Sequence, residues 1–595
     1  MFHRGPIGDE ESRPTGKASV YIKRLWPYFR PYLGRVIAAG LLMLVSSGMG
    51  LLGPLLLRRA IDVNIAHGDL HGLAITSLVY LVAQASILVA TYFQIVWLAR
   101  VGEQGAADIK HKLFRHLLDL PVSFFGKTPV GKLVSRTESD TEALRMLFSR
   151  IALMLFQSLL VITGMSIVMA LVSWRLYLLV LVLLPPFIIA LRMFQRRVRP
   201  VYLAVRKTVA ETNALVSEVM KGLPVVQVFC QQERFARRID DLSRLKYRRE
   251  LKAMTLWYGI WFLVDFSEVL GLGMVLGFGG TWALSGQYGM TIGTLFMFVA
   301  YITRLFGPLR AISGQLNQMQ RAFASAERIF GMLDQQPEPE GEDDDGELTL
   351  REKIRFDGIG LAYEEENYVL EDIDLVVRKG EKVALVGETG GGKSSLVNLL
   401  LRFYEAQKGS ILFDERELGR LNLQRLRSVV GFVPQEVIMF PGSVLDNLRM
   451  LDSTVPRERV IEAAKRARIH DAVMQFPDGY DTNLIERGVN FSLGQRQLLA
   501  FARALVFDPQ LLILDEATSS VDPHTEQLIQ EGLKELLQGR TAIIVAHRLA
   551  TIEMVDRIVV VHKGRITEQG THEELIRQDG IYSRLYRLQY VGEEV

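Results

Sequence analysis

The stretch that decides the fold is Gly-Glu-Thr-Gly-Gly-Gly-Lys-Ser-Ser at residues 387–395, which has the spacing of a phosphate-binding P-loop. Its glycines let successive backbone N–H groups point into one concavity, where they bind phosphate oxygens. We expect Lys393 to reach the β- and γ-phosphates and Ser394 to offer its hydroxyl to Mg²⁺. The apolar run 383–386 predicts a buried parallel strand before the loop, and residues 396–401 predict a helix after it.

A second apolar run, residues 511–514, ends in Asp515-Glu516. A carboxylate at the carboxyl end of a strand beside a P-loop is placed to hold Mg²⁺, and its neighbour can polarise an attacking water. The alternative is an ordinary exposed acidic pair after a strand. Beside the P-loop, the pair predicts a Mg²⁺ ligand next to a residue that can polarise an attacking water.

These motifs resemble, at residues 351–590, the nucleotide-binding domain of ABC transporters, and nearly the whole chain resembles a half-size ABC exporter. The resemblance implies that Tyr363 stacks on adenine and that Gln435 touches Mg²⁺ and senses the membrane domain. It also implies that Glu516 is the catalytic base and that His547 contacts the γ-phosphate. Each role has a simpler alternative: Tyr363 as a surface aromatic, Gln435 as a loop amide and His547 as a structural histidine. The implied ATP-binding residues are Tyr363, Gly387, Glu388, Thr389, Gly390, Gly391, Gly392, Lys393, Ser394 and Ser395, and the implied metal ligands are Ser394, Gln435 and Asp515.

The motif Ser492-Leu493-Gly494-Gln495 resembles the ABC signature, which in the family closes over the γ-phosphate held by a partner chain. The resemblance further implies that Asp522 communicates across the dimer and that Glu486 touches the coupling loops. Because this chain has one P-loop and one signature, the working unit is expected to be a head-to-tail dimer.

One position departs from the family pattern. Leu493 stands where the usual signature has Gly, which adds a side chain where backbone must approach closely. Lys393, Asp515, Glu516 and His547 are intact, so the chain's own nucleotide site is expected to be competent. This asymmetry resembles one subunit of heterodimeric bacterial multidrug exporters, and we predict a heterodimer over a homodimer.

Mean hydropathy is +0.18, which is high for a chain with 23% charged residues, and the long apolar segments all lie in residues 36–313. Most of these apolar segments have about 20 residues or more, which is long enough for a helix to cross a hydrocarbon core of about 30 Å. Pro185-Pro186 interrupts one of them, which a helix bundle tolerates. The six expected spans lie near residues 36–57, 74–98, 149–173, 176–193, 256–280 and 291–313.

The distribution of Lys and Arg among the connections predicts which of them face the cytoplasm. The connections 61–73 and 281–290 contain neither, whereas 99–147 and 194–254 are rich in both. The N-terminus, the long connections and the ATPase are therefore expected on the cytoplasmic side of a bacterial cytoplasmic (inner) membrane. The long connections resemble the coupling helices of ABC exporters, with coupling regions near 124–131 and 218–229; the alternative is a separate soluble insertion.

Asp265 and Glu268 lie in the fifth expected span, three residues apart and so on one helix face. Ionisable groups at such depth are costly unless they face water or a partner. One hypothesis is that they line the substrate cavity and favour cationic amphipathic compounds. The alternative is a structural polar contact with Arg304 of the sixth span.

The expected fold is a membrane all-α six-helix exporter domain followed by a cytosolic α/β P-loop ATPase cassette. We expect a cytoplasmic tail and elbow helix at 1–35, the membrane domain at 36–332, an acidic linker at 333–350 and the nucleotide-binding domain at 351–595. A net charge of +3 suggests no nucleic-acid partner, and the single cysteine, Cys230, excludes an intrachain disulfide.

The function expected first is ATP-driven export of hydrophobic or amphipathic compounds. A lipid flippase of the same architecture is the second reading. A non-transporting ATPase or an ATP-gated channel is a third reading, and the intact catalytic motifs argue against the channel. The sequence shows no large extra domain for peptide processing, which disfavours a peptide-secretion exporter with its own protease.

Overall fold

A computed structural model describes residues 18–182, 184–342, 348–363, 367–485, 488, 490–515, 522–546 and 548–587. Its contacts divide the chain into two units. The N-terminal unit holds the residues up to Leu118 together with Val130–Gln335, and the C-terminal unit holds Asp119–Pro129 together with the residues from Gln336 onward.

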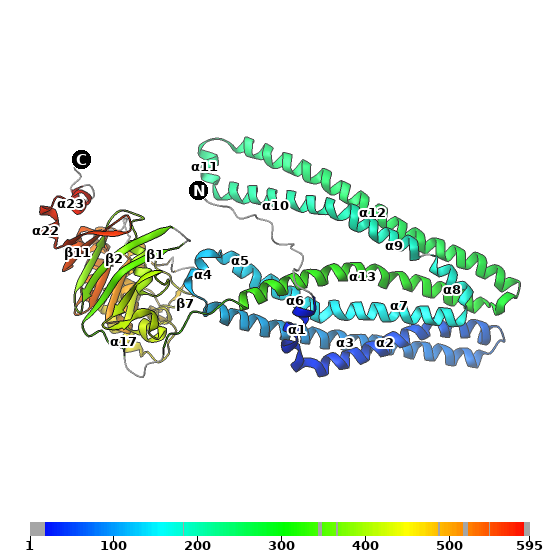
Figure 1. The fold of residues 1–595 in the computed structure, drawn as a ribbon. Coiled ribbons are helices and arrows are strands. Elements are labelled where there is room, and N and C mark those ends of the chain that lie inside the picture. The colour runs from blue at the N-terminus through cyan, green and yellow to red at the C-terminus, as the bar shows by residue number, and fades with distance from the viewer. Residues whose placement is uncertain are drawn as a thin grey trace. The chain divides into compact units, whose positions relative to one another are not determined.

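The N-terminal unit is built of helices (Figure 1). Their apolar side chains remain exposed along much of their length, as lipid-facing helices require. The long helices are α2 (Leu33–Arg59), α3 (Leu70–Leu118), α7 (Ala152–Val172), α10 (Arg199–Lys221), α12 (Gln232–Leu284) and α13 (Ile292–Leu333). The shorter ones are α1 (Ala18–Phe29), α5 (Val130–Ser135), α6 (Thr141–Met146), α8 (Trp174–Leu181), α9 (Leu184–Met193) and α11 (Leu223–Val228).

Five helical stretches within the described residues are long and apolar enough to cross a membrane. They are Ser19–Ile65, Leu70–Leu118, Val130–Val172, Gln232–Leu284 and Ile292–Leu333. The fourth span expected from sequence, 176–193, falls on α8 and α9, and Leu183 between them lies outside the described residues.

Helices α3 and α12 are far longer than a span needs. At 1.5 Å per residue, helices of 49 and 53 residues reach about 75 to 80 Å, more than twice the hydrocarbon thickness. Helix α10 runs beside α12 over the part of α12 that precedes its apolar segment (Figure 1). The long connections predicted from sequence are therefore helical.

The elbow helix α1 is fixed to the end of α13. Arg24 donates to Asp334 Oδ2 at 2.7 Å, and its guanidinium lies 4.4 Å from the centre of the Phe330 ring. Leu25 is buried, and the rings of Tyr21 and Phe323 stack. The amphipathic N-terminal segment thus packs on the helix that leads into the C-terminal unit.

The C-terminal unit contains a six-stranded sheet, mostly parallel, in the order β12-β11-β3-β10-β9-β6. A four-stranded antiparallel sheet has the order β2-β1-β4-β5, and β7 pairs with β8. The strands are β1 (Lys353–Ala362), β2 (Tyr368–Arg378), β3 (Lys382–Val386), β4 (Lys408–Phe413), β5 (Arg416–Glu417), β6 (Val430–Val433), β7 (Gly442–Ser443), β8 (Asn483–Leu484), β9 (Leu511–Asp515), β10 (Thr541–Val545), β11 (Arg557–His562) and β12 (Arg565–Gly570).

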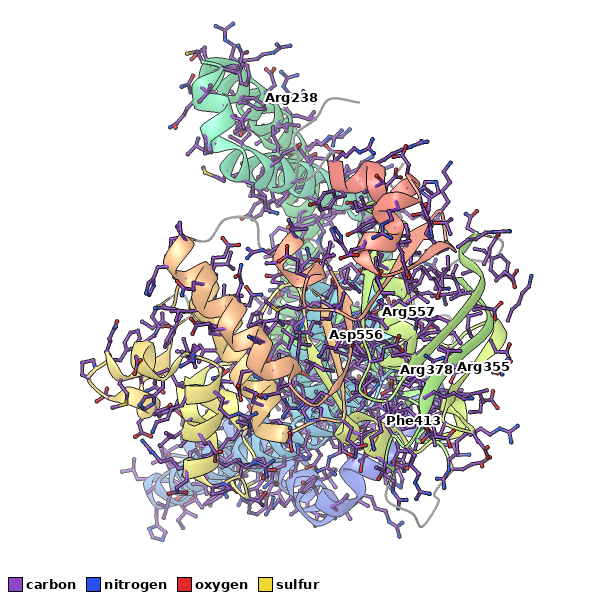
Figure 2. All side chains as sticks on the ribbon, turned by 90° about the vertical axis from the view of Figure 1, so that its left-hand side faces the viewer. Arg238, Arg355, Arg378, Phe413, Asp556 and Arg557 are labelled. Atoms are coloured by element: carbon purple, nitrogen blue, oxygen red, sulfur yellow. The ribbon has the colours of Figure 1, made fainter. Side chains whose placement is uncertain are left out.

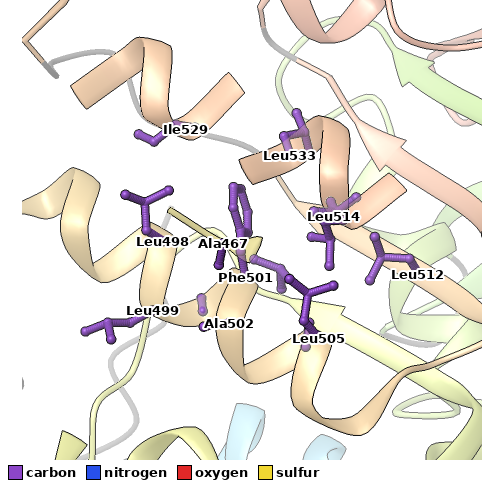
Figure 3. Close-up of a cluster of buried hydrophobic side chains, with 14 of the residues drawn as sticks. Ala467, Leu498, Leu499, Phe501, Ala502, Leu505, Leu512, Leu514, Ile529 and Leu533 are labelled. Carbon is purple, nitrogen blue, oxygen red and sulfur yellow. The ribbon is translucent and has the colours of Figure 1, made fainter. Parts of the chain in front are cut away.

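Helices fill the remainder of this unit. They are α4 (Val122–Lys127), α14 (Lys393–Leu400), α15 (Leu423–Val429), α16 (Val444–Leu448), α17 (Arg457–Arg466), α18 (His470–Met474), α19 (Leu493–Phe507), α20 (Pro523–Leu537), α21 (Leu549–Ile552), α22 (His572–Arg577) and α23 (Ile581–Tyr586). Buried side chains of α19, α20 and β9, among them Phe501, Leu533 and Leu514, form one apolar cluster (Figure 3). This cluster fixes the signature helix α19 against the strand that ends in Asp515.

Arg557 connects the two sheets, and Asp556 beside it holds the start of β11 to β3; Figure 2 labels both residues. Asp556 accepts from the backbone N–H of Lys382 in β3 at 2.8 Å. Arg557 donates to Glu381 at 2.8 Å and to the carbonyl of Val376 in β2. The parallel sheet that supports the P-loop is therefore held to the antiparallel sheet that carries Tyr363 at its end.

Candidate nucleotide site

The P-loop connects β3 to α14, the strand-to-helix context that its sequence predicts. Gly387 and Gly392 have φ of +151° and +105°, conformations that a residue with a β-carbon seldom adopts. A β-carbon at Gly387 would lie 2.1 Å from the carbonyl oxygen of Val561 in β11. The loop therefore needs glycine at residue 387 for both its conformation and its packing.

Lys393 begins α14 and is buried, with 5% of its surface exposed. Its Nζ donates to the carbonyls of Gly387 at 2.6 Å and Glu388 at 2.8 Å, so the ammonium lies within the loop. Burial lowers the pKa of Lys393, and the negative charges of Asp515 and Glu388 oppose that shift. A bound polyphosphate would stabilise the charged form that burial disfavours.

Tyr363, at the end of β1, lies against the P-loop helix. Its hydroxyl donates to Ser395 Oγ at 3.0 Å and accepts from Asn398 Nδ2 at 3.4 Å. Its ring meets the ring of Tyr404 edge to face, with centroids 4.8 Å apart. Sequence reasoning selected Tyr363 but missed Asn398 and Tyr404, since no motif spacing links them to residue 363.

Gln435, Leu493 and Asp515 line one narrow cleft of about 20 Å³, roughly the room of a single water. Asp515 ends β9, Gln435 follows β6, and Leu493 is the first residue of α19. The cleft brings together three predicted site residues that are far apart in the sequence. The side-chain oxygens of Gln435 and Asp515, with the exposed Ser394 hydroxyl in the first turn of α14, are of the hard type that Mg²⁺ prefers.

The signature residues cap their own helix. Ser492 Oγ accepts from the backbone N–H of Gln495 at 3.2 Å, and Gln495 Oε1 accepts from the N–H of Ser492 at 2.9 Å. This reciprocal capping box rigidifies the start of α19. Because Leu493 is the first helical residue, its backbone accommodates a side chain without strain within its own chain, and 43% of its surface is exposed.

Asp522 is the N-cap of α20, where its Oδ1 accepts from the backbone N–H of Thr525 at 2.9 Å. This backbone hydrogen bond lowers the pKa of Asp522. The three other predicted residues, Glu516, His547 and Glu486, lie outside the described residues.

Asp265 and Glu268 of α12 both contact one arginine of α13, but it is Arg310 and not the Arg304 named from sequence. Arg310 Nη2 lies 2.7 Å from Asp265 Oδ1 and 2.7 Å from Glu268 Oε2. Arg304 instead donates to the carbonyl of Gly50 in α2 at 3.2 Å. The packing of α12 on α13 sets which arginine faces the carboxylates, and hydropathy does not specify that packing.

The N-terminal unit also contains an open cavity of about 560 Å³. Among the described residues, Asp265 and Glu268 do not line it. Of the described residues that line it, Arg150 is the charged one, and the other polar ones are glutamines and a serine: Gln157, Ser158, Gln315 and Gln318.

Comparison with known proteins agrees with this geometry. Residues 36–309 match the family described as the ABC transporter transmembrane region, and residues 370–519 match the family described as ABC transporter. The chain belongs to the ABC transporter family. It is a fused half-transporter, with a helical membrane domain and an ATP-binding, ATP-hydrolysing domain in one multi-pass chain.

Two relatives cover this ABC transporter almost end to end. An ATP-dependent lipid A-core flippase of Syntrophus aciditrophicus is 34% identical over 588 residues, which span 96% of this chain and 96% of the relative. The multidrug resistance-like ATP-binding protein MdlB of Buchnera aphidicola is 32% identical over 571 residues, 96% of this chain and 98% of the relative. Names of relatives therefore include both multidrug and lipid transporters.

Proposed function

We propose that the chain exports hydrophobic or amphipathic compounds across a bacterial cytoplasmic membrane at the expense of ATP, as one half of a dimer. The observation that carries this proposal is the covalent union of a P-loop ATPase, with Lys393 buried in its loop, and helices apolar enough to span a bilayer. The test is ATP-dependent uptake into inverted vesicles that contain the chain, measured with panels of dyes, lipids and peptides. Vesicles that hydrolyse ATP but move no compound in any panel would contradict the export proposal.

Mg²⁺ fits the oxygen donors at this site. Ser394, Gln435 and Asp515 would hold it, and the ion would neutralise charge on the β- and γ-phosphates. Lys393 binds the same phosphates, the Tyr363 ring orients the adenine, and Glu516 holds the proton of the attacking water. Replacing Lys393 by Ala should abolish ATP binding. Lys393→Arg should retain part of the binding, because Arg keeps the positive charge but spreads it over a planar guanidinium that does not match the compact ammonium.

A head-to-tail dimer is the arrangement in which the signature of one chain would cap the P-loop of the other. Within this proposal we favour a heterodimer, because Leu493 adds bulk to the surface offered to the partner while Lys393 and Asp515 keep this chain's own site intact. The test compares substrate-stimulated ATPase of the chain purified alone with that of co-expressed pairs. Stimulation of the chain alone that equals the best pair would refute the heterodimer and favour a homodimer.

For the substrate we favour cationic amphipathic compounds. Asp265, Glu268 and Arg310 together carry one excess negative charge at the depth of the membrane. Asp265→Asn with Glu268→Gln should reduce export of cationic dyes more than export of neutral dyes of similar size. An equal effect on both classes would assign the pair a structural role instead.

A lipid flippase is the second candidate, and the cavity beside Arg150 is the observation that favours it. One cation among amides and apolar side chains suits an anionic headgroup attached to acyl chains. Flipping of labelled anionic lipid that falls in Arg150→Gln, with dye export unchanged, would support this candidate. Loss of dye export with lipid flipping unchanged would support export of hydrophobic or amphipathic compounds instead.

The orientation proposed here places the N-terminus and the ATPase in the cytoplasm. The chain's single cysteine, Cys230, is exposed, so it reports sidedness without engineering. A membrane-impermeant thiol reagent should label Cys230 in inverted vesicles and not in intact spheroplasts. The opposite pattern would reverse the topology.

A further inference from the structure

The turn that joins β11 to β12 lies against the P-loop. The backbone N–H of Gly564 in this turn donates to the carbonyl of Gly391 at 3.1 Å, and the Gly564 carbonyl accepts from the backbone N–H of Glu371 in β2 at 2.9 Å. Lys563 and Gly564 have φ of +48° and +78°, as a tight two-residue hairpin turn requires. His562, the last residue of β11, is thereby held beside the P-loop.

The imidazole of His562 carries a polar atom without a partner. Its Nδ1 is buried and has no hydrogen-bond partner among the residues that the structure describes. Oε2 of Glu388 in the P-loop lies 4.0 Å from that nitrogen, which is about 1 Å beyond hydrogen-bond distance. The Glu388 side chain is 63% exposed, so its carboxylate has room to approach. An imidazole that gains a proton therefore has a carboxylate within reach.

Glu388 also acts on Lys393. The carbonyl of Glu388 accepts from Lys393 Nζ at 2.8 Å. Burial lowers the pKa of Lys393, and the negative charges of Asp515 and Glu388 oppose that shift. The same carboxylate repels a polyphosphate bound to the loop. Neutralising it would therefore change how strongly this site attracts phosphate.

Four other charged groups lie on the elements around His562. Arg565, its partner in the ladder of β11 and β12, is 2.8 Å from Glu371 of β2. Asp372 follows Glu371 in the chain, and Lys563 follows His562 in the turn. These two acidic and two basic groups offset one another. The P-loop carboxylate is thus the acidic group that a charge on His562 meets directly.

We propose that His562 is a positioning residue of the nucleotide site: its protonated imidazole pairs with Glu388 and thereby strengthens the binding of ATP. Imidazole takes up a proton between about pH 5 and pH 8. The pair neutralises the carboxylate, so Lys393 and the loop N–H groups present a more positive surface to the phosphates. His562 performs no chemistry and acts through Glu388. The inference concerns ATP binding, so it goes beyond the proposed export and does not depend on which compound is moved.

The experiment measures the Kd of a fluorescent ATP analogue, with saturating Mg²⁺, for the full chain in lipid nanodiscs between about pH 5.5 and pH 8. His562→Gln cannot gain a proton, and His562→Lys carries a positive charge without the imidazole. Dividing the Kd of each variant by that of wild type at the same pH removes the titration of the nucleotide, which is common to all the proteins.

The two variants should depart from wild type at opposite ends of this range. His562→Gln should match wild type at the alkaline end and bind about three- to fivefold more weakly at the acidic end, as expected for one charge pair near water. His562→Lys should match wild type at the acidic end and bind about three- to fivefold more tightly at the alkaline end. Lys563→Gln is the matched control, because it removes an exposed charge from the same turn without touching the imidazole. Its Kd ratio to wild type should be the same at every pH.

Glu388→Gln supplies the decisive arm. This change removes the charge that His562 is proposed to pair with. In the Glu388→Gln background, His562→Gln should therefore stay within about twofold of its parent at every pH.

Two results would overturn the inference: a His562→Gln ratio that is constant across pH, or a pH-dependent ratio that persists in the Glu388→Gln background. A constant loss of affinity would assign His562 a merely structural role, and thermal unfolding of each variant would reveal such a defect. If His562→Gln fails to fold, His562→Lys still decides, since binding no tighter than wild type at the alkaline end would refute the pairing. A chain that shows the pH response but moves no compound would refute export alone.

Discussion

Two glycines of the same loop make the nucleotide site testable at the level of a single methyl group. Gly387 and Gly390 both have positive φ, +151° and +83°. A β-carbon at Gly387 would lie 2.1 Å from the Val561 carbonyl oxygen, whereas a β-carbon at Gly390 would meet no atom within 4 Å. The pair therefore separates conformational strain from steric conflict.

The expected magnitudes follow from these two environments. In Gly390→Ala the cost is the positive φ alone, about 1–2 kcal/mol for an L-residue, which corresponds to roughly five- to thirtyfold weaker ATP binding. In Gly387→Ala the same strain adds to a conflict with the backbone of β11, which cannot yield as a side-chain tip does. We expect a total above about 3 kcal/mol and therefore more than about 100-fold weaker binding.

The assay is equilibrium binding of a fluorescent ATP analogue to the purified full chain, with thermal unfolding recorded for each variant. Gly390→Ala should remain folded, because its β-carbon meets no atom within 4 Å, whereas Gly387→Ala is compared with wild type by thermal unfolding, because Val561, whose carbonyl it meets, belongs to a buried apolar cluster. The reasoning would be refuted if the two variants lost equal affinity, or if Gly390→Ala lost more than Gly387→Ala.

Three further predictions concern catalysis, pH and stability. Glu516→Gln should stop steady-state hydrolysis while the chain still binds ATP; turnover at the wild-type rate would remove Glu516 as the base. Because burial lowers the pKa of Lys393 and bound phosphates raise it again, ATP affinity should be full below the pKa of the nucleotide-free chain and fall as pH rises through it. Calorimetry across alkaline pH would show the decline in wild type and a flat profile in Lys393→Arg. Asp140 is 5% exposed and accepts from Arg328 Nε and Ser325 Oγ, each at 2.8 Å, so Asp140→Ala should destabilise the membrane domain by about 3–5 kcal/mol. Thermal unfolding should show a clearly smaller loss of stability in Asp140→Asn than in Asp140→Ala. An unchanged unfolding midpoint in Asp140→Ala would contradict the predicted destabilisation.

The fold was largely predictable because its strongest signals are local. Apolar segments long enough for a bilayer predicted the spans that α2, α3, α7, α12 and α13 provide. The P-loop also lies between a strand and a helix as its spacing predicted, since the glycines and the preceding apolar run act within a few residues. The span interrupted by Pro185-Pro186 gave the weakest helical signal, and it corresponds to two short helices, α8 and α9.

The site was predictable only where a motif identified the residue. Tyr363 and Asp515 belong to such motifs, and the structure places Tyr363 on Ser395 and Asp515 in a cleft with Gln435. Tyr404 belongs to no recognised spacing, and it contacts Tyr363 only because the chain after α14 returns to the end of β1.

By itself, the sequence determined the family and predicted the chemistry: a phosphate-binding loop, acidic residues beside it, a signature altered at Leu493 and helices for a membrane. Tertiary structure alone decided the pairings, namely Arg310 rather than Arg304 with the two carboxylates, and Tyr404 with Tyr363. The physical reason is the distance along the chain over which each signal acts. A motif encodes backbone conformation and charge within a few residues, whereas the register in which two helices pack depends on side chains that no local pattern connects.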